Sequence, residues 1–152
     1  MRTLLILLLL FSFSHSKQYI FMINKYDKEI ELEAKIISKI ATASLDNEIK
    51  IYIPNISKQE EEIYSKYFHL SKDCKYANFI FDKKGSIENN CESSGKLFFT
   101  NNYKRLVSDN KYFGAFFWNK SRPNIVFIKQ RLENNNINLS KEYEQFIEDT
   151  YE

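Results

Sequence analysis

All four residues of the segment Ile125-Val126-Phe127-Ile128 are apolar, so the odd and the even positions of this strand are equally apolar. Successive side chains of a strand point to opposite faces of its sheet, so both faces of this strand must be covered by other elements. Strands of this kind are typical of sheets that carry helices on both sides. This feature therefore indicates a layered α/β domain.

The patterns along the rest of the chain alternate between helix and strand, which agrees with that class. A helical stripe predicts a first helix over 27–45 with Asp27 as its N-cap. The capping-box pattern Ser57-Lys58-Gln59-Glu60 predicts a second helix that runs to about Phe68. The other expected strands are 49–53, 77–81, 96–100, 112–118 and 124–129, and the other expected helices are 103–109, 129–135 and 141–149. We expect one α/β domain with a mostly parallel or mixed sheet flanked by helices, a C-terminal β-hairpin and two terminal helices.

The first 16 residues have the composition of a secretory signal peptide. Arg2 precedes an unbroken apolar run from Leu4 to Phe11, and small residues follow, with cleavage expected after Ser16. The alternative is a retained membrane anchor, but the run is about half of the roughly 20 residues needed to cross a bilayer. We expect a periplasmic protein whose single domain spans 17–152.

Charge and composition argue against several classes of function. Without residues 1–16 the chain has 21 basic and 20 acidic residues, which is not the balance of a nucleic-acid-binding protein. Its three glycines form no phosphate-binding motif, and His69 is the only histidine outside the signal peptide. No catalytic triad or zinc ligand set can be assembled from these residues, so we expect neither an enzyme, a metal site nor a cofactor.

Cys74 and Cys91 are the only cysteines, and both lie in the exported part. An even pair in an oxidising compartment more often forms a disulfide than a redox site. The sequence therefore predicts a Cys74–Cys91 disulfide, with free thiols as the alternative.

A polar segment after the strand 96–100 is the best candidate ligand site. In open α/β sheets, ligands bind outside the carboxyl ends of the strands, where following helices begin. Thr100, Asn101, Asn102 and Arg105 combine hydrogen-bond donors with a cation at such a position. They predict a site for a small polar or anionic ligand, and helix capping by a solvated segment is the alternative.

The stretch GAFFWNKSRPNI, residues 114–125, predicts the corner of a β-hairpin. Strict alternation places Phe113 and Phe117 on one face of the first strand and Phe116 and Trp118 on the other. Most of these aromatic side chains are expected in the core.

The end of this hairpin is a second candidate site. Trp118 ends the first strand, and Lys120 and Arg122 lie in the turn beyond it. Either cation can stack on the indole, or the three residues can form a patch that faces a partner, because Trp and Arg are frequent among interface hot spots.

The order of these features resembles the YfiR-like family of periplasmic repressors of membrane diguanylate cyclases. The similar features begin with a signal peptide. Within about residues 28–150 they are an opening helix, a strand, a helix, a cysteine just before the buried strand in 74–81, the strand GAFFW, the segment NIVFIKQRLENNNINLS and a terminal helix. The chain has two cysteines where four are common in that family. The resemblance implies a domain that binds the periplasmic part of an inner-membrane signalling protein, as a homodimer.

Two hypotheses of function follow. The first is an exported, non-enzymatic regulatory or sensor domain that acts on an inner-membrane signalling protein. The second is a small periplasmic solute-binding domain equivalent to one lobe of a binding protein, in which Arg105, Lys104 and Asn101-Asn102 hold an anionic or polar ligand.

Overall fold

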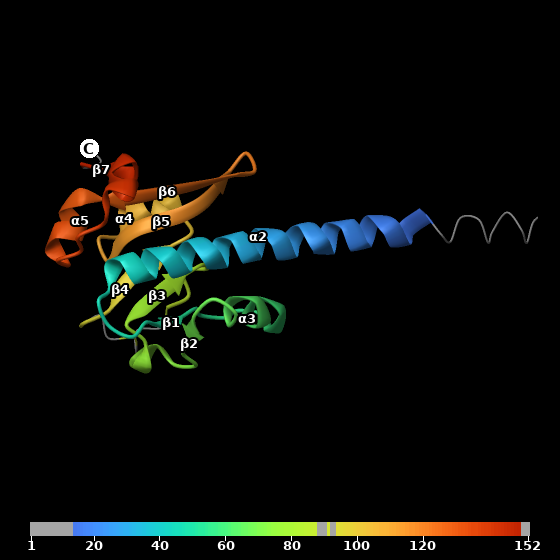
Figure 1. Ribbon diagram of the computed structural model, residues 1–152, viewed down its shortest axis with the longest axis horizontal. Helices are drawn as coiled ribbons and strands as arrows, with labels where there is room; N and C mark the ends of the chain where they lie inside the picture. The colour runs from blue at the N-terminus through green and yellow to red at the C-terminus, as the bar shows by residue number, and fades with distance from the viewer. Residues whose placement is uncertain (1–13, 88–90, 92–93, 150–152) are drawn as a thin grey trace, which may run out of the picture.

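The protein is described by a computed structural model that covers residues 14–87, 91 and 94–149 (Figure 1). Its centre is a seven-stranded sheet with the order β2-β1-β3-β4-β5-β6-β7. The strands are β1 Lys50–Tyr52, β2 His69–Leu70, β3 Phe79–Asp82, β4 Leu97–Thr100, β5 Tyr112–Asn119, β6 Arg122–Ile128 and β7 Ile147–Glu148. The helices are α2 Ser14–Ser44, α3 Lys58–Tyr64, α4 Tyr103–Ser108 and α5 Lys129–Asn134, with 3-10 helices η1 Cys74–Tyr76 and η2 Lys141–Phe146.

The sheet is mixed and mostly parallel, as the apolar strand pattern predicted. The strands β1 to β5 are parallel to their neighbours, β5 and β6 are antiparallel, and β7 is parallel to β6. The order of the first five strands reverses between β1 and β3, which is the switch point of a doubly wound sheet. The prediction of a single α/β domain is confirmed.

The two faces of the sheet are covered unequally. One core cluster contains buried residues of α2, α3, α5 and η2 together with strand residues. The cluster on the other face includes Leu106 of α4, with Cys74 and Cys91 packed against its border. The first face thus has most of the helical cover, and α2 lies lengthwise across it (Figure 1).

Helix α2 is much longer than predicted. Its buried stripe includes Ile30, Ala34, Ile37 and Ala41, as the spacing predicted. The prediction that Asp27 caps its start is wrong, because α2 begins at Ser14 and Asp27 lies inside it. Between residues 17 and 44 the chain has no glycine or proline to end a helix, so α2 continues and projects beyond the sheet (Figure 1). The signal-peptide prediction falls mainly on residues 1–13, which lie outside the described part.

A bulge in β5 overturns the predicted alternation of its aromatic residues. Phe98 pairs with Tyr112 and Phe99 pairs with Gly114, so Phe113 is an extra residue between two paired ones. A bulge of this kind shifts the later residues relative to the earlier ones. Phe113 therefore lies in the same core cluster as Phe116, whereas Phe117 lies at the other face.

The bulge also explains why residue 114 is a glycine. A Cβ atom at Gly114 would lie 2.6 Å from Phe99 Cε2, 2.7 Å from Phe127 Cδ1 and 2.8 Å from the Val126 carbonyl oxygen. These rings belong to the cluster that Phe113 fills. No side chain fits at this position without moving a backbone atom or two buried rings.

The remaining differences from the predicted elements concern short segments. Ser57 and Glu60 form the predicted capping box, but α3 ends at Tyr64, earlier than expected. The residues after it form a turn and then β2, which the sequence did not predict. The helix expected over 141–149 is the 3-10 helix η2, followed by β7. Two-residue strands are too short to show alternation, so their pairing with β1 and β6 is visible only in the fold.

Candidate functional site

The carboxyl ends of β1, β3, β4 and β5 lie at one edge of the sheet because these strands are parallel. The loop after β1, the loop after β3, the start of α4 and the tip of the β5–β6 hairpin all lie at this edge, which we call the carboxyl edge. Helix α2 leaves the domain on the same side (Figure 1). The polar residues that the fold brings to this edge form two clusters.

The first cluster is built around Asp82, the last residue of β3, which is fully buried. Its Oδ2 accepts a 2.5 Å hydrogen bond from the Tyr112 hydroxyl, and its Oδ1 accepts from the backbone N–H groups of Gly85 and Ser86. Burial raises the pKa of Tyr112, and the hydrogen bond to Asp82 raises it further, so this phenol stays protonated. Asp82 therefore fixes both the turn after β3 and the start of β5.

Two of the predicted ligand residues, Thr100 and Arg105, belong to this cluster. Arg105 Nη1 lies 3.2 Å from Thr100 Oγ1, 3.2 Å from the Asp82 carbonyl oxygen and 3.9 Å from Asp82 Oδ2. The guanidinium lies directly over Gly85, where a Cβ atom would come within 2.6 Å of Nη2. The positive φ of 67° at Gly85 also favours glycine.

The other two predicted ligand residues are not gathered at the guanidinium. Asn102 is the N-cap of α4, and its side chain accepts from the Arg105 N–H, as the capping alternative proposed. Asn101 is partly exposed at the end of β4. The structure thus joins Thr100 to Arg105 and uses Asn102 to hold the helix.

The second cluster is centred on Lys83, the residue after Asp82. Lys83 Nζ lies 2.8 Å from Glu33 Oε1 of α2, 2.7 Å from Glu60 Oε1 of α3 and 3.0 Å from the Tyr64 hydroxyl. The Tyr64 hydroxyl donates to Glu33, and Glu60 also accepts from Ser57. This cluster joins α2, α3 and the loop after β3 through one largely shielded ammonium group.

Charge compensation decides the ionisation of this cluster. Burial acts to raise the pKa of Glu60, but hydrogen bonds from Lys83 and Ser57 outweigh it and the pKa is lowered. Burial acts to lower the pKa of Lys83, but Glu33 and Glu60 outweigh it and the pKa is raised. The lysine and Glu60 are therefore charged at neutral pH, and they form an ion pair with each other.

Sequence reasoning missed Asp82 and Lys83 as organising residues. The available signal was the Asp82-Lys83-Lys84-Gly85 segment, in which charged residues directly follow a buried strand. Charges at such a position have to be paired or solvated, and only the fold shows which partners they find.

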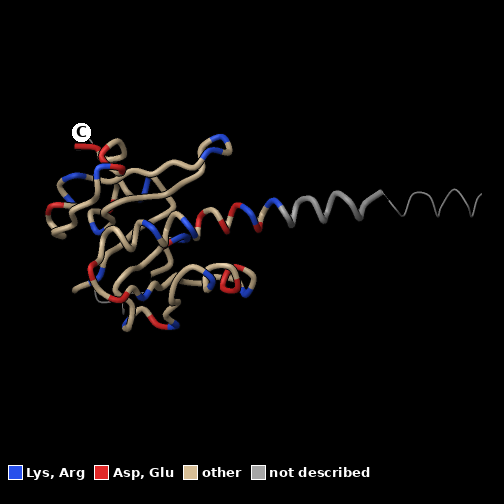
Figure 2. The backbone as a smooth tube through the Cα atoms, viewed as in Figure 1, with Lys and Arg blue, Asp and Glu red and all other residues tan. Residues whose placement is uncertain are grey.

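The hairpin tip carries the other predicted residues, Trp118, Lys120 and Arg122. Lys120 and Ser121 form its two-residue turn with positive φ values of 47° and 63°, typical of a tight hairpin. Both cations are exposed and line an open hollow of about 460 Å³ with Asn119 and Asn124. Basic residues mark this tip in Figure 2.

The predicted stacking of a cation on the indole does not occur. In the described part of the chain the cation–π contacts involve tyrosine rings. Trp118 packs edge-on against Phe116, with ring centroids 5.7 Å apart, at the border of the first core cluster. The indole thus packs between the hairpin and the core, whereas the side chains of Lys120 and Arg122 are exposed to solvent.

Cys74 and Cys91 lie next to each other, both half-buried and both as free thiols. Burial raises the pKa of the Cys91 thiol to about 12, and its hydrogen bond with Cys74 contributes. A thiol with a raised pKa is a poor nucleophile at neutral pH.

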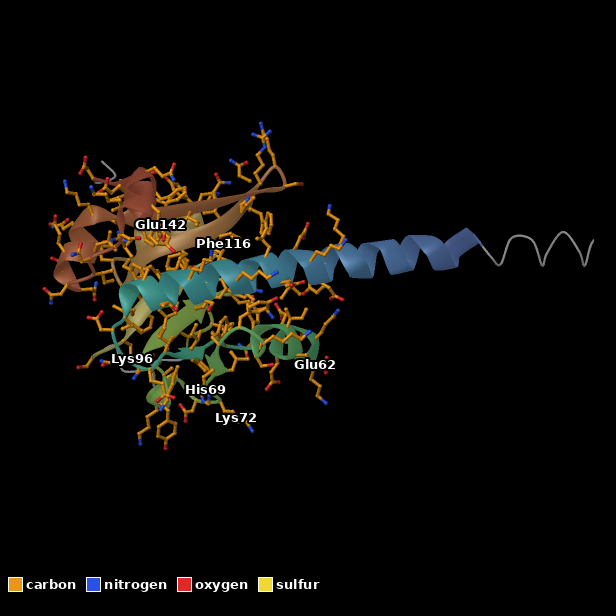
Figure 3. The ribbon with its side chains drawn as sticks, in the orientation of Figure 1. Glu62, His69, Lys72, Lys96, Phe116 and Glu142 are labelled. Atoms are coloured by element: carbon orange, nitrogen blue, oxygen red, sulfur yellow. The ribbon has the colours of Figure 1, made fainter. Side chains whose placement is uncertain are left out.

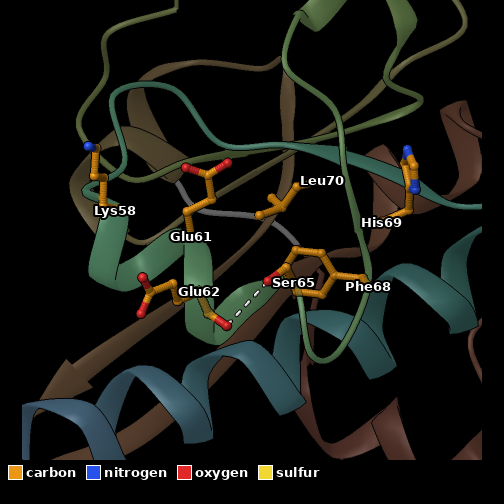
Figure 4. Close-up of a pocket in the computed structure, with 7 residues that line it drawn as sticks. All are labelled: Lys58, Glu61, Glu62, Ser65, Phe68, His69 and Leu70. Carbon is orange, nitrogen blue, oxygen red and sulfur yellow. Dashed lines mark hydrogen bonds between the residues drawn. The ribbon is translucent and has the colours of Figure 1, made fainter.

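A further hollow of about 840 Å³ lies between α3 and β2, and it could not be expected beforehand because β2 was not predicted. Figure 4 shows the side chains around it, and Figure 3 places Glu62, His69 and Lys72 along this border of the molecule. It is lined by Lys58, Glu61, Glu62, Ser65, Phe68, His69 and Leu70. An adjoining hollow of about 460 Å³ shares Glu61 and Leu70 and continues to Ser71 and Lys72.

Comparison with protein-family models, with curated proteins and with solved structures gives no match. Within the described residues, no helix is long and apolar enough to cross a membrane. No group of three or more potential metal ligands is found in that same part of the chain.

Proposed function

We propose that this protein is an exported, non-enzymatic regulatory domain that binds the periplasmic part of an inner-membrane signalling protein. The observation that carries the proposal is the shape of the carboxyl edge. The amino-terminal part of α2 and the β5–β6 hairpin both project past the sheet on that side (Figure 1). Elements that extend beyond their own domain offer a surface to a partner without any rearrangement of the core.

The chemistry of this edge favours binding over catalysis. Asp82, Glu33, Glu60 and Lys83 are charged groups that are largely shielded from water there, and each is held by partners within the domain. A general acid or base needs a polar group that is free to reach a substrate. These groups instead stabilise the loops that present the surface.

The exposed cations of the hairpin tip are the proposed contact residues. Lys120 lies in the two-residue turn and Arg122 begins β6, and Trp118 packs against Phe116 in the strand before them. Arginine at the centre of an interface commonly contributes more than 1 kcal/mol to binding. The resemblance to the YfiR-like family supports the choice of partner and implies that the domain acts as a dimer.

Crosslinking in the periplasm followed by purification tests the proposal. We expect the wild-type protein to capture an inner-membrane protein, and deletion of the gene to change the level of cyclic di-GMP and biofilm formation. The double variant Lys120→Ala with Arg122→Ala should lose the capture, whereas Lys141→Ala, which removes an exposed cation elsewhere, should keep it. Unchanged cyclic di-GMP together with no captured membrane protein would refute the proposed function.

We propose that Cys74 and Cys91 form a disulfide in the periplasm. Their adjacent thiols and the oxidising compartment support it. A bridge that closes this loop stabilises by about 3 kcal/mol in the chain-entropy model. Protein isolated from the periplasm should show no thiol that reacts with a maleimide under denaturing, non-reducing conditions, and two reactive thiols would disprove the bridge.

Solute binding is the second candidate, favoured by the Thr100–Arg105 contact at the carboxyl edge. Thermal unfolding in the presence of inorganic phosphate, citrate and a panel of amino acids tests it. A ligand at 100 times its dissociation constant should stabilise the fold by roughly 2.7 kcal/mol. The stabilisation should disappear in Arg105→Met and persist in Lys141→Met, which removes an exposed cation elsewhere, and no shift with any compound would count against this candidate.

A further inference from the structure

Among the strands that the structure describes, β2 has one edge without a neighbouring strand. In the described sheet β2 is the outermost strand, and β1 is the strand beside it. Ser71 N–H donates to the Ile51 carbonyl oxygen at 2.8 Å, so this peptide group points its N–H toward β1. The Leu70 carbonyl belongs to the same planar trans peptide and points the opposite way, and the Leu70 N–H leaves the strand on that side too. Leu70 thus presents a donor and an acceptor outward.

The space beside this edge is hollow. The hollows of about 840 Å³ and about 460 Å³ meet at Leu70 and Glu61, so together they run along β2 and past its end. Helix α3 forms one wall and β2 the other (Figure 4). A groove between a helix and an exposed strand edge is the arrangement in which an extended peptide adds to a sheet.

The side chains along the groove define the chemistry of the occupant. Phe68 and Leu70 are partly buried and provide apolar surface, Glu61 and Glu62 are exposed on α3, and Lys58 and Lys72 also line the two hollows. Neither carboxylate forms an ion pair within the described residues. A lysine or arginine side chain fits both features, since its aliphatic stem covers apolar surface while its cationic end reaches a carboxylate.

We propose that this groove binds an extended segment of a partner protein with lysine or arginine at alternate positions, which pairs with β2 as an additional strand. Alternate side chains of an added strand point to the same face, so successive basic residues meet the wall formed by α3. The outward N–H and C=O of Leu70 supply the main-chain hydrogen bonds. This site is separate from the hairpin tip and does not depend on the proposed function.

Fluorescence anisotropy with a labelled ten-residue peptide of alternating threonine and lysine tests the proposal, with a threonine–glutamate peptide as its counterpart. We expect the lysine peptide to bind and the glutamate peptide to bind at least ten-fold more weakly. The double variant Glu61→Gln with Glu62→Gln should weaken the lysine peptide several-fold. Equal binding of both peptides, or none of the lysine peptide, overturns the proposal.

A matched pair of variants separates strand addition from simple charge attraction. Leu70→Pro removes the outward N–H but not the Ser71 bond to β1, and Leu70→Ala removes the same apolar side chain while keeping that N–H. Binding should fall at least ten-fold further in the proline variant than in the alanine variant. Equal losses of affinity in the two variants would contradict strand pairing. A dimer of the protein that the peptide does not dissociate would also contradict it, because the edge of β2 would then pair with a second copy.

Amide hydrogen exchange of the unmodified protein provides a measurement that does not depend on the folding of a variant. Saturating lysine peptide should slow exchange at Leu70 at least ten-fold. Ser71 should change little because its N–H is already bonded to Ile51. Unchanged exchange at Leu70 in the bound protein would show that the peptide binds without joining the sheet, and would overturn the inference.

Discussion

Replacement of Lys83 by methionine should destabilise the fold more than any other substitution of a single lysine at the carboxyl edge. Methionine retains most of the hydrocarbon volume but removes the ammonium that lies 2.8 Å from Glu33 and 2.7 Å from Glu60. The two carboxylates would stay in sites where the residues are only 5% and 7% exposed. Removal of one partner from a buried ion pair costs about 3–5 kcal/mol.

This cost is a large share of the free energy of unfolding, which is typically about 5–15 kcal/mol. With a urea dependence of about 2 kcal/mol per molar, the unfolding midpoint should fall by roughly 2 M. Trp118 is the only tryptophan and borders the core, so its fluorescence follows the transition. Lys84→Met is the matched control, because Lys84 is exposed and, among the described residues, its ammonium donates to the Asn55 carbonyl oxygen alone.

The pH dependence gives a second check. In the wild type the lowered pKa of Glu60 contributes stability above its unfolded pKa, and this is lost as the pH falls through the folded value. The raised pKa of Lys83 contributes stability below its unfolded pKa, and this is lost as the pH rises through the folded value. Without the lysine, only the hydrogen bonds from Ser57 oppose the effect of burial on Glu60, so its pKa rises from the wild-type value and the deficit of the variant should shrink as the pH falls from 7 toward 4.5. A midpoint shift no larger than that of Lys84→Met, or a deficit independent of pH, would refute this reasoning.

Two further substitutions test the packing of β5 and α4. Gly114→Ala should destabilise by about 1–3 kcal/mol or prevent folding, because the new methyl meets a backbone carbonyl and two buried rings. The control Gly95→Ala should cost about 1 kcal/mol in the same urea titration, because residue 95 has a φ of 70° but nothing within 4 Å of its Cβ. Equal costs in the two variants would refute the explanation of Gly114 by the bulge. Arg131→Met should cost about 2–4 kcal/mol in thermal unfolding, because Nη1 donates to three backbone carbonyls, at 2.6, 2.8 and 3.2 Å, at the end of α4 and the start of β5. Lys129→Met, which breaks only an exposed ion pair, should cost below about 1 kcal/mol, and a similar loss in both would contradict the role of Arg131.

The sequence allowed prediction of those elements that contain a complete local signal. The stripe in α2, the capping box of α3 and the apolar alternation of β1 each depend on residues close together in the chain. The start of α2 was predicted wrongly because an Asp caps a helix only where the preceding residues are not helical. Residues 17–26 contain no glycine or proline, so the helix continues through Asp27. The edge strands β2 and β7 were missed because a two-residue strand is defined by its hydrogen bonds to the adjacent strand and is too short to show an alternating sequence pattern.

The candidate site divides in the same way. Thr100 and Arg105 were predicted because parallel strands bring their carboxyl ends to one edge, a rule that needs only the order of elements. The bulge at Phe113 was not predictable from alternation, although Gly114 beside it marked a place where no side chain fits. The clusters around Asp82 and Lys83 join residues about 20 to 50 positions apart, so their pairing depends on the packing of α2, α3 and α4.

The two buried charges that the sequence did not single out are adjacent in the chain, and this adjacency links the two sides of the sheet. Asp82 holds Tyr112 and lies near Arg105, on the side that α4 covers. Lys83 holds Glu33 of α2 and Glu60 of α3, on the opposite side. Consecutive residues at the end of a strand point to opposite faces, so one short turn anchors both covering layers. A displacement of α2 relative to the sheet would lengthen the contact between Glu33 and Lys83, and Lys83 is joined by one peptide bond to Asp82, which holds the turn and Tyr112 on the other face.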